Sequence, residues 1–271
     1  MQRLTAPFRV AAIQMVSEPA VEANLAAAED LIAAAAEQGA KLVALPEWFC
    51  FIGRAERDKL ALREQYGAGP IQSFLARVAA QFRVWLVGGT LPLAGARDGQ
   101  VRNACLVFDD AGRRVARYDK IHLFDFTGGG EQYRESNTIE AGDTPLAIDS
   151  PFGRVGLSVC YDVRFPELYR RLAPIDLISV PSAFTAMTGA AHWEILLRAR
   201  AVENLAWVIA PAQGGHHPTG RRTHGHTMVV DPWGKVVASL AHGPGLVLAD
   251  IDPSYQQAVR EQLPALQHRV L

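Results

Sequence analysis

The chain has 271 residues, of which 49% are apolar and 20% are charged, a composition that excludes disordered and fibrous proteins. Its 27 Lys and Arg residues face 28 Asp and Glu residues, and the net charge of −1 provides no electrostatic case for nucleic acid or an anionic membrane as main partner. The longest charge-free stretches, residues 177–193 and 204–220, are interrupted by Ser, Thr, Pro, Gly and His, so no membrane-spanning segment is predicted.

The cysteines and the start of the chain bear on the compartment. Cys50, Cys105 and Cys160 are odd in number and widely spaced, which indicates a reducing environment and no disulfide framework. Residues 1–7 lack the apolar block of a signal peptide. These features predict a cytoplasmic protein.

Short apolar runs alternate with helical patterns along the chain. Strands are predicted at residues 10–15, 42–45, 84–87, 105–108, 114–118, 155–160, 177–180, 208–210, 228–230 and 246–251. Most of these runs are continuous, which is typical of strands covered on both faces. Helices are predicted from Val21 to a stop at Gly39, from Pro70 to Phe82, and over residues 191–204. The alternation predicts an α/β layered fold.

Two decapeptides share one pattern. Residues 107–116 and 229–238 both read V-x-D-x-x-G-[RK]-x-V-A, and a strand ending in proline lies upstream of each. The pattern is explained either by the needs of hairpin turns or by two similar halves packed as four layers. No linker-like segment divides the chain, so a single domain over residues 1–271 is predicted.

Three residues stand where chemistry is possible. Glu47 follows a predicted buried strand, Cys160 ends another, and Lys120 follows a hairpin strand. Ligands of α/β sheets gather outside the carboxyl ends of strands, where two of these groups would meet. Taken singly, each has a structural explanation as well: a core cysteine, a solvated glutamate and a surface lysine.

The segments around these residues resemble the nitrilase superfamily of carbon–nitrogen hydrolases. The matching segments, in the family's order, are Leu-Pro-Glu at 45–47, Tyr-Asp-Lys-Ile-His at 118–122 and Gly-Leu-Ser-Val-Cys-Tyr-Asp-Val-Arg-Phe-Pro-Glu-Leu at 156–168. The resemblance extends over nearly the whole chain. It implies a four-layer α-β-β-α sandwich that hydrolyses a nonpeptide C–N bond without a metal or other cofactor, and a homodimer or higher even oligomer.

The resemblance also implies a role for each residue. Cys160 would attack the amide carbonyl, and Glu47 would act as the general base. Lys120 and the backbone N–H of Tyr161 would stabilise the oxyanion. Glu135 matches a second glutamate that the family places beside the lysine, and it would have a supporting role.

Within the superfamily the chain resembles the Nit-type amidases, through residues 181–184, 188–194 and 197–204. Residues 212–217 and 224–234 favour deaminated glutathione as the substrate, with α-ketoglutaramate or another small carboxylated amide as the alternative. These substrates need an anchor for a carboxylate. The candidate substrate-binding residues are Arg134, Phe184 and His192, with Arg221 and Arg222 as further candidate anchors.

Other functions are compatible with parts of the sequence. A papain-like hydrolase would pair Cys160 with His122 or His192, and a non-catalytic scaffold would use none of these residues. A histidine cluster at positions 216, 217, 224 and 226 raises the alternative of a zinc site, but its spacing is not that of a metal signature.

Two segments are predicted to form the homodimer face. They are residues 166–172, directly after the Cys160 segment, and the helix over residues 193–204, which mixes apolar and charged side chains. Leu168 and Leu196 are the predicted apolar anchors of this interface.

Overall fold

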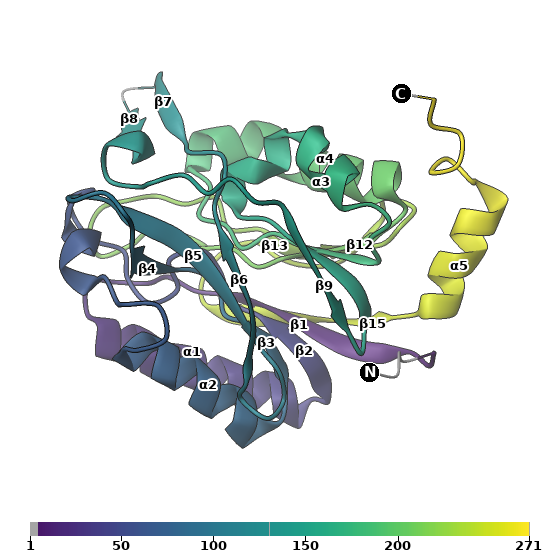
Figure 1. Cartoon of the computed structure of the whole chain (residues 1–271), viewed down its shortest axis with the longest axis horizontal. Coiled ribbons are helices and arrows are strands. Elements are labelled where there is room, and N and C mark those ends of the chain that lie inside the picture. The colour runs from purple at the N-terminus through teal and green to yellow at the C-terminus, as the bar shows by residue number, and fades with distance from the viewer. Residues whose placement is uncertain (1–4, 130, 271) are drawn as a thin grey trace.

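Two β-sheets lie face to face between two pairs of helices, so that the chain forms four layers (Figure 1). The computed structural model describes residues 5–129 and 131–270. Residues 1–4, part of the stretch in which no signal peptide is predicted, lie outside the described residues.

Among the described residues, the first sheet has seven strands in the order β15-β1-β2-β3-β5-β4, with β6 paired to β5. Its strands are β1 (Phe8–Gln14), β2 (Ala40–Ala44), β3 (Trp85–Val87), β4 (Leu91–Ala94), β5 (Val101–Phe108), β6 (Arg114–Asp119) and β15 (Gly245–Ile251). Strand β1 pairs with β2 in parallel and with β15 in antiparallel orientation, so the last strand of the chain completes the first sheet.

The second sheet has six described strands in the order β14-β13-β12-β11-β10-β9. They are β9 (Leu146–Ser150), β10 (Gly153–Leu157), β11 (Leu177–Ser179), β12 (Trp207–Ala210), β13 (Thr227–Val230) and β14 (Val236–Leu240). A separate hairpin of β7 (Asp125–Gly128) and β8 (Glu131–Arg134) projects beside the two sheets (Figure 1).

The helices form the outer layers. In Figure 1, α1 and α2 lie below the first sheet and α3 and α4 lie above the second. The described helices are α1 (Val21–Glu37), α2 (Pro70–Phe82), α3 (Pro166–Leu172), α4 (Ala186–Asn204) and α5 (Pro253–Gln262), with 3-10 turns η1 (Asp58–Leu62), η2 (Glu135–Asn137) and η3 (Cys160–Arg164). Within the described ranges, no helix is both long and apolar enough to cross a membrane.

Strand β1 explains why the apolar runs are continuous. Its residues alternate in direction, as in any strand. Val10 and Ala12 belong to the core shared with the second sheet, and Ala11 and Ile13 to the core shared with α1 and α2. Both faces of the strand are therefore buried, and the predicted α-β-β-α sandwich is confirmed.

Three local predictions are wrong. Helix α4 begins at Ala186 and not at residue 191, because the Thr185 side chain accepts a hydrogen bond from the Thr188 N–H and caps the helix. Strand β10 ends at Leu157, so Cys160 lies in η3 and not at the end of a strand. Leu168, a predicted interface anchor, packs into the core with only 3% of its surface exposed.

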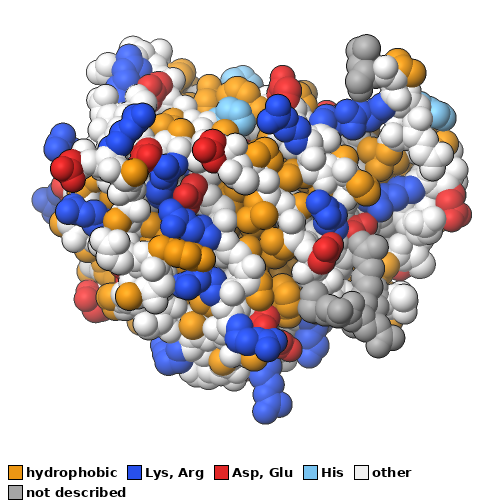
Figure 2. Space-filling view, viewed as in Figure 1, with side chains coloured by type: hydrophobic (Ala, Val, Ile, Leu, Met, Phe, Trp, Pro, Cys, Tyr) orange, Lys and Arg blue, Asp and Glu red, His pale blue; other side chains and the backbone are white. Residues whose placement is uncertain are grey.

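The surface agrees with the near-zero net charge. On the face drawn in Figure 2, Lys and Arg side chains lie beside Asp and Glu side chains over most of the area. Apolar side chains are distributed between these charged groups.

Candidate active site

A buried lysine between two carboxylates forms the centre of the site. The Lys120 Nζ atom lies 3.0 Å from Glu47 Oε1 and 2.8 Å from Glu135 Oε2. Lys120 follows β6, Glu47 follows β2, and Glu135 lies in η2. The Lys120 side chain is fully buried, and Glu47 is 2% exposed. Burial on this scale requires the charges to be paired, as they are here.

Both oxygens of Glu47 have further partners. Oε1 accepts a hydrogen bond from Asn103 Nδ2 at 2.8 Å, and Oε2 accepts one from the Ala183 N–H at 2.9 Å. Asn103 lies on β5 of the first sheet, and Ala183 follows β11 of the second. The carboxylate is therefore held in one orientation by groups from both sheets.

Cys160 occupies a strained turn. Its φ of 51° lies in the left-handed region that residues other than glycine seldom adopt. The Asp162 carboxylate holds this turn, because it accepts hydrogen bonds from the Val159 N–H at 2.8 Å, the Tyr118 hydroxyl at 2.7 Å and the His122 N–H at 2.9 Å. Asp162 thereby links the turn that carries Cys160 to the segment that carries Lys120.

Cys160 and both glutamates face one small space, here called the inner chamber. Its volume is about 20 Å³, enough for about one water molecule. The residues around it are Glu47, Phe124, Glu135, Cys160, Tyr161, Ala183, Phe184, Thr185, Thr188 and Arg221.

The charges in this chamber set the ionisation of its groups. Burial raises the pKa of the Cys160 thiol well above its ordinary value, and the negative charge of Glu47 raises it further. Burial lowers the pKa of Lys120, but Glu135 and Glu47 outweigh this effect and raise it overall. Burial raises the pKa of Glu135, and the attraction of Lys120 offsets only part of the rise. The resting state therefore holds a neutral thiol beside an ammonium group.

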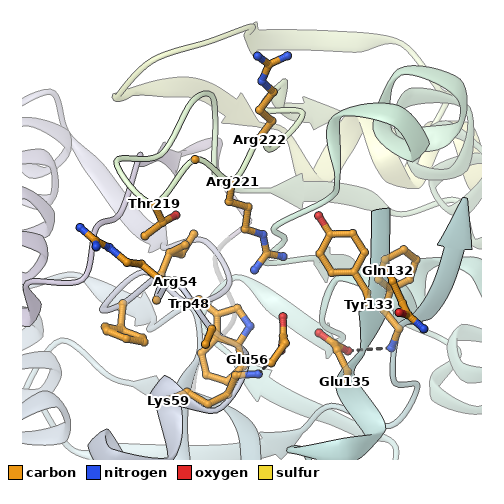
Figure 3. Close-up of a pocket in the computed structure, with 16 residues that line it drawn as sticks. Trp48, Arg54, Glu56, Lys59, Gln132, Tyr133, Glu135, Thr219, Arg221 and Arg222 are labelled. Atoms are coloured by element: carbon orange, nitrogen blue, oxygen red, sulfur yellow. Dashed lines mark hydrogen bonds and ion pairs between the residues drawn. The ribbon is translucent and has the colours of Figure 1, made fainter. Parts of the chain in front are cut away.

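A larger space, here called the outer cavity, adjoins the inner chamber. Its volume is about 590 Å³, within the range of small-molecule sites. Phe124, Glu135 and Arg221 line both spaces. In Figure 3 the Arg221 side chain points into the cavity, whereas Arg222 extends away from the other labelled side chains.

The predicted substrate-binding residues are separated in the structure. Phe184 lines the inner chamber. Arg134 lies on β8 and donates hydrogen bonds to the Tyr133 carbonyl and to Thr127 Oγ1. His192 is exposed on α4, where its ring nitrogen lies 3.1 Å from Arg164. Arg134 and His192 are not among the residues that line either space.

The histidines do not converge on one point. His217 contacts the Ser17 carbonyl and Thr223, whereas the His224 ring stacks on His226 with centroids 4.3 Å apart. Over the described part of the chain, no group of three or more His, Cys, Asp or Glu side chains is arranged to hold a metal ion. His122 contacts Asp162 and stacks on Phe165. The charged groups that affect the pKa of Cys160 are Glu47, Lys120 and Glu135, and no histidine is among them.

Two partners of Glu47, Asn103 and the Ala183 N–H, were not predicted from the sequence. Asn103 precedes the predicted strand at residues 105–108 and follows the charged Arg102, so its full burial had no clear signal in the sequence. The Ala183 N–H carried no signal, because a backbone donor is independent of the side chain at its position.

These observations agree with comparisons with known proteins. The family model "Carbon-nitrogen hydrolase" matches residues 9–261. The chain belongs to this family, and it is a hydrolase of amide carbon–nitrogen bonds.

Particular relatives are also similar over most of their length. A deaminated glutathione amidase from Synechocystis is 46% identical over 270 residues, which covers 97% of this chain and 98% of the relative. The crystal structure of the Caenorhabditis elegans NitFhit protein superposes with a TM-score of 0.89 at 39% identity, covering 100% of this chain and 66% of that chain. A variant of the amidase from Nesterenkonia sp. AN1, in which acrylamide has added to the active-site cysteine, superposes with a TM-score of 0.78 at 29% identity, covering 96% and 99% of the two chains.

Proposed function

We propose that Cys160 is the nucleophile of this amidase and that Glu47 is its general base and acid. The shared inner chamber of the thiol and the Glu47 carboxylate supports these roles. Because the raised pKa keeps the thiol protonated, a neighbouring base has to take the proton as the sulfur attacks. The supporting role of Glu135 is to hold the Lys120 ammonium, to which it is hydrogen bonded.

The reaction proceeds through a thioester in two steps. Cys160 Sγ attacks the amide carbon as its proton passes to Glu47, and the Lys120 ammonium and the Tyr161 N–H stabilise the oxyanion. The C–N bond then breaks, and Glu47 protonates the leaving nitrogen. A water molecule gives a proton to Glu47 and attacks the thioester, the C–S bond breaks, and the proton returns to Cys160. These groups fill every role, so the proposal requires no metal or other cofactor.

The proposed substrate is deaminated glutathione, and the volume of the outer cavity supports this proposal. The inner chamber has a volume of only about 20 Å³, so most of a substrate has to occupy the outer cavity. A cavity of about 590 Å³ suits a cysteinylglycine leaving group better than the ammonia that α-ketoglutaramate releases. α-Ketoglutaramate is the second candidate.

The test is the release of 2-oxoglutarate, the acyl product common to both amides. Wild-type protein is expected to have the higher kcat/KM for deaminated glutathione, and Cys160→Ala to have no turnover with either amide. Cys105→Ala, a control at a cysteine buried in the core, should keep the wild-type rate. Turnover by Cys160→Ala would exclude Cys160 as the nucleophile. A higher kcat/KM for α-ketoglutaramate would make it the preferred substrate in place of deaminated glutathione. Dialysis against EDTA is expected to leave the rate unchanged.

We propose that residues 1–271 act as one carbon–nitrogen hydrolase domain, located in the cytoplasm. Groups from both sheets contact Glu47, which supports a single functional unit. The three cysteines are unpaired and buried, as expected of a protein in a reducing compartment.

We propose that the active form is a homodimer or a higher even oligomer that associates through α4. This helix leaves Met187, Ile195 and Val202 at the surface, with 44%, 67% and 44% of their areas exposed. An exposed apolar stripe on a surface helix favours association.

A further inference from the structure

The cationic side chains of the outer cavity exceed its carboxylates. Its lining includes Arg54, Lys59, Arg221 and Arg222, against Glu56 and Glu135. Both carboxylates are already paired, since Glu56 accepts a hydrogen bond from Lys59 at 2.6 Å and Glu135 accepts one from Lys120 at 2.8 Å. The cavity therefore favours an anionic ligand.

Among the cationic residues of the outer cavity, Arg221 is the one that reaches the inner chamber. It lines both the inner chamber and the outer cavity, and no other cationic residue in either lining does so. Its guanidinium lies over the Tyr133 ring, 5.5 Å from the centroid (Figure 3). The aromatic face limits the orientations of the guanidinium plane, which favours planar recognition of a carboxylate.

Arg221 also has unused hydrogen-bonding capacity. Its Nε atom is buried and has no hydrogen-bond partner among the described residues. The same is true of the hydroxyl oxygen of Thr219, two residues away in the same lining. Buried polar atoms without partners are rare in folded proteins, and two in one cavity wall are explained by a ligand that bonds to them.

We infer that Arg221, assisted by the Thr219 hydroxyl, binds a carboxylate of the substrate and selects anionic amides over neutral ones. The inference rests on the proposed amidase function and identifies the substrate class of the same site. Deaminated glutathione offers a carboxylate on its 2-oxoacyl part and another on its leaving dipeptide. Either one presents the same chemistry to a guanidinium.

Calorimetric titration tests the inference without turnover. The ligands are 2-oxoglutarate and N-acetylcysteinylglycine, each with a neutral counterpart, the dimethyl ester and the N-acetyl dipeptide amide. Arg221→Gln is expected to weaken binding of at least one anion by about 10- to 100-fold, the range for hydrogen bonds to a charged group. Binding of the neutral counterparts should be weak and unchanged. The anion that loses affinity identifies which end of the substrate Arg221 binds.

Two further variants separate anchoring from a merely structural effect. Arg63→Gln, the same change at an exposed arginine that lines neither space, should bind as wild type does. Arg221→Lys should recover part of the affinity, because it restores the charge without the fork geometry. Unchanged anion binding by Arg221→Gln, or equal weakening by Arg63→Gln, would overturn the inference.

Kinetics separate this inference from the proposed function. With wild type, kcat/KM for deaminated glutathione should exceed that for its diester, and Arg221→Gln should remove this preference mainly through KM. If anions bind through Arg221 but neither amide is hydrolysed, the proposed function fails and the anchor stands. If both amides are hydrolysed equally by wild type and Arg221→Gln, the anchor fails and the function stands.

Discussion

The buried charges around Cys160 have a cost that their geometry explains. Glu47, Lys120 and Glu135 are removed from water, and the desolvation of each ion is repaid only by good pairing. Each carboxylate also accepts a backbone N–H, from Ala183 in one case and Phe124 in the other. Such a network holds the groups in fixed positions before a substrate arrives, as catalysis requires.

Glu47→Gln tests the proposed proton-transfer role of this carboxylate. The variant keeps the size of the side chain but has no base, so kcat/KM is expected to fall by about 100- to 10,000-fold. An ester substrate with a good leaving group should still acylate Cys160 slowly. Because deacylation needs the same base, mass spectrometry of the intact protein should show a persistent adduct.

The matched control for this variant is Glu140→Gln. Glu140, like Glu47, carries a carboxylate in an ion pair, with Arg102 at 2.6 Å, but it is only partly buried and lies outside both spaces of the site. The Glu140→Gln variant should turn over amides at the wild-type rate. Circular dichroism should show both variants folded at the assay temperature. Wild-type turnover by Glu47→Gln would exclude this residue as the base.

At the scale of turns and strands, the backbone conformation at Cys160 was not predictable from the sequence. The apolar run over residues 155–160 predicts a strand that continues to the cysteine, but the strand ends at Leu157. The cause is the side chain of Asp162, which takes the Val159 N–H out of the sheet pattern. A contact with a partner in the folded structure therefore overrides a local propensity.

Elements with strong local signals were predictable, and others were not. Helix α2 begins at Pro70 and ends at Phe82 as predicted, because proline and apolar periodicity act within the segment. The start of α4 was hidden, since Gly189 and Thr188 weaken the helical pattern of its first turns. The inward direction of Leu168 depends on how α3 packs on the sheet, which no periodicity within seven residues determines.

The loop that follows β12 is tied to the loop after β1 by a pH-sensitive contact. The His217 ring contacts the Ser17 carbonyl and Thr223 Oγ1, each at 2.8 Å, and the residue is 3% exposed. Burial lowers the pKa of His217 from 6.5 to about 4. Below pH 6.5, the ordinary pKa of histidine, His217 binds a proton more readily in the unfolded state than in the folded state. Neutral His217 therefore stabilises the fold fully above about pH 6.5, and this stabilisation is lost as the pH falls toward 4.

His217→Gln should therefore flatten the pH dependence of stability. Between pH 7 and pH 4.5, wild type is expected to lose about 1–3 kcal/mol of unfolding free energy more than the variant does. Urea unfolding at the two pH values measures the difference, and carboxylate contributions cancel between the proteins. His268→Gln, at an exposed histidine near the C-terminus, should keep the wild-type dependence. An equal loss in wild type and His217→Gln would contradict the prediction.

At the scale of the whole molecule, α4 connects the surface to the turn that carries Cys160. Arg200, 5% exposed, donates from Nε to the Val163 carbonyl of η3 at 2.8 Å. Trp193 and Leu197 of the same helix belong to the hydrophobic core cluster that also includes Cys160. A partner that covers the outer face of α4 would therefore restrain the turn that carries the proposed nucleophile.

The proposed association is tested at Ile195, which replaces the predicted anchors Leu168 and Leu196. A charge at Leu168 would destabilise the core, and Leu196 is only partly exposed and packs against the core. Ile195 is 67% exposed, so Ile195→Glu changes the surface at little cost to folding. Sedimentation should show a dimer for wild type and, for Ile195→Glu, a dissociation constant at least about 10-fold higher, as for the loss of a buried apolar anchor. Activity should fall with dimer content, because the restraint on η3 is lost.

The control is Val115→Glu, the same change at an apolar residue of β6 that is 42% exposed, and this variant should remain dimeric and active. A fully active wild-type monomer at assay concentration would exclude the role of association.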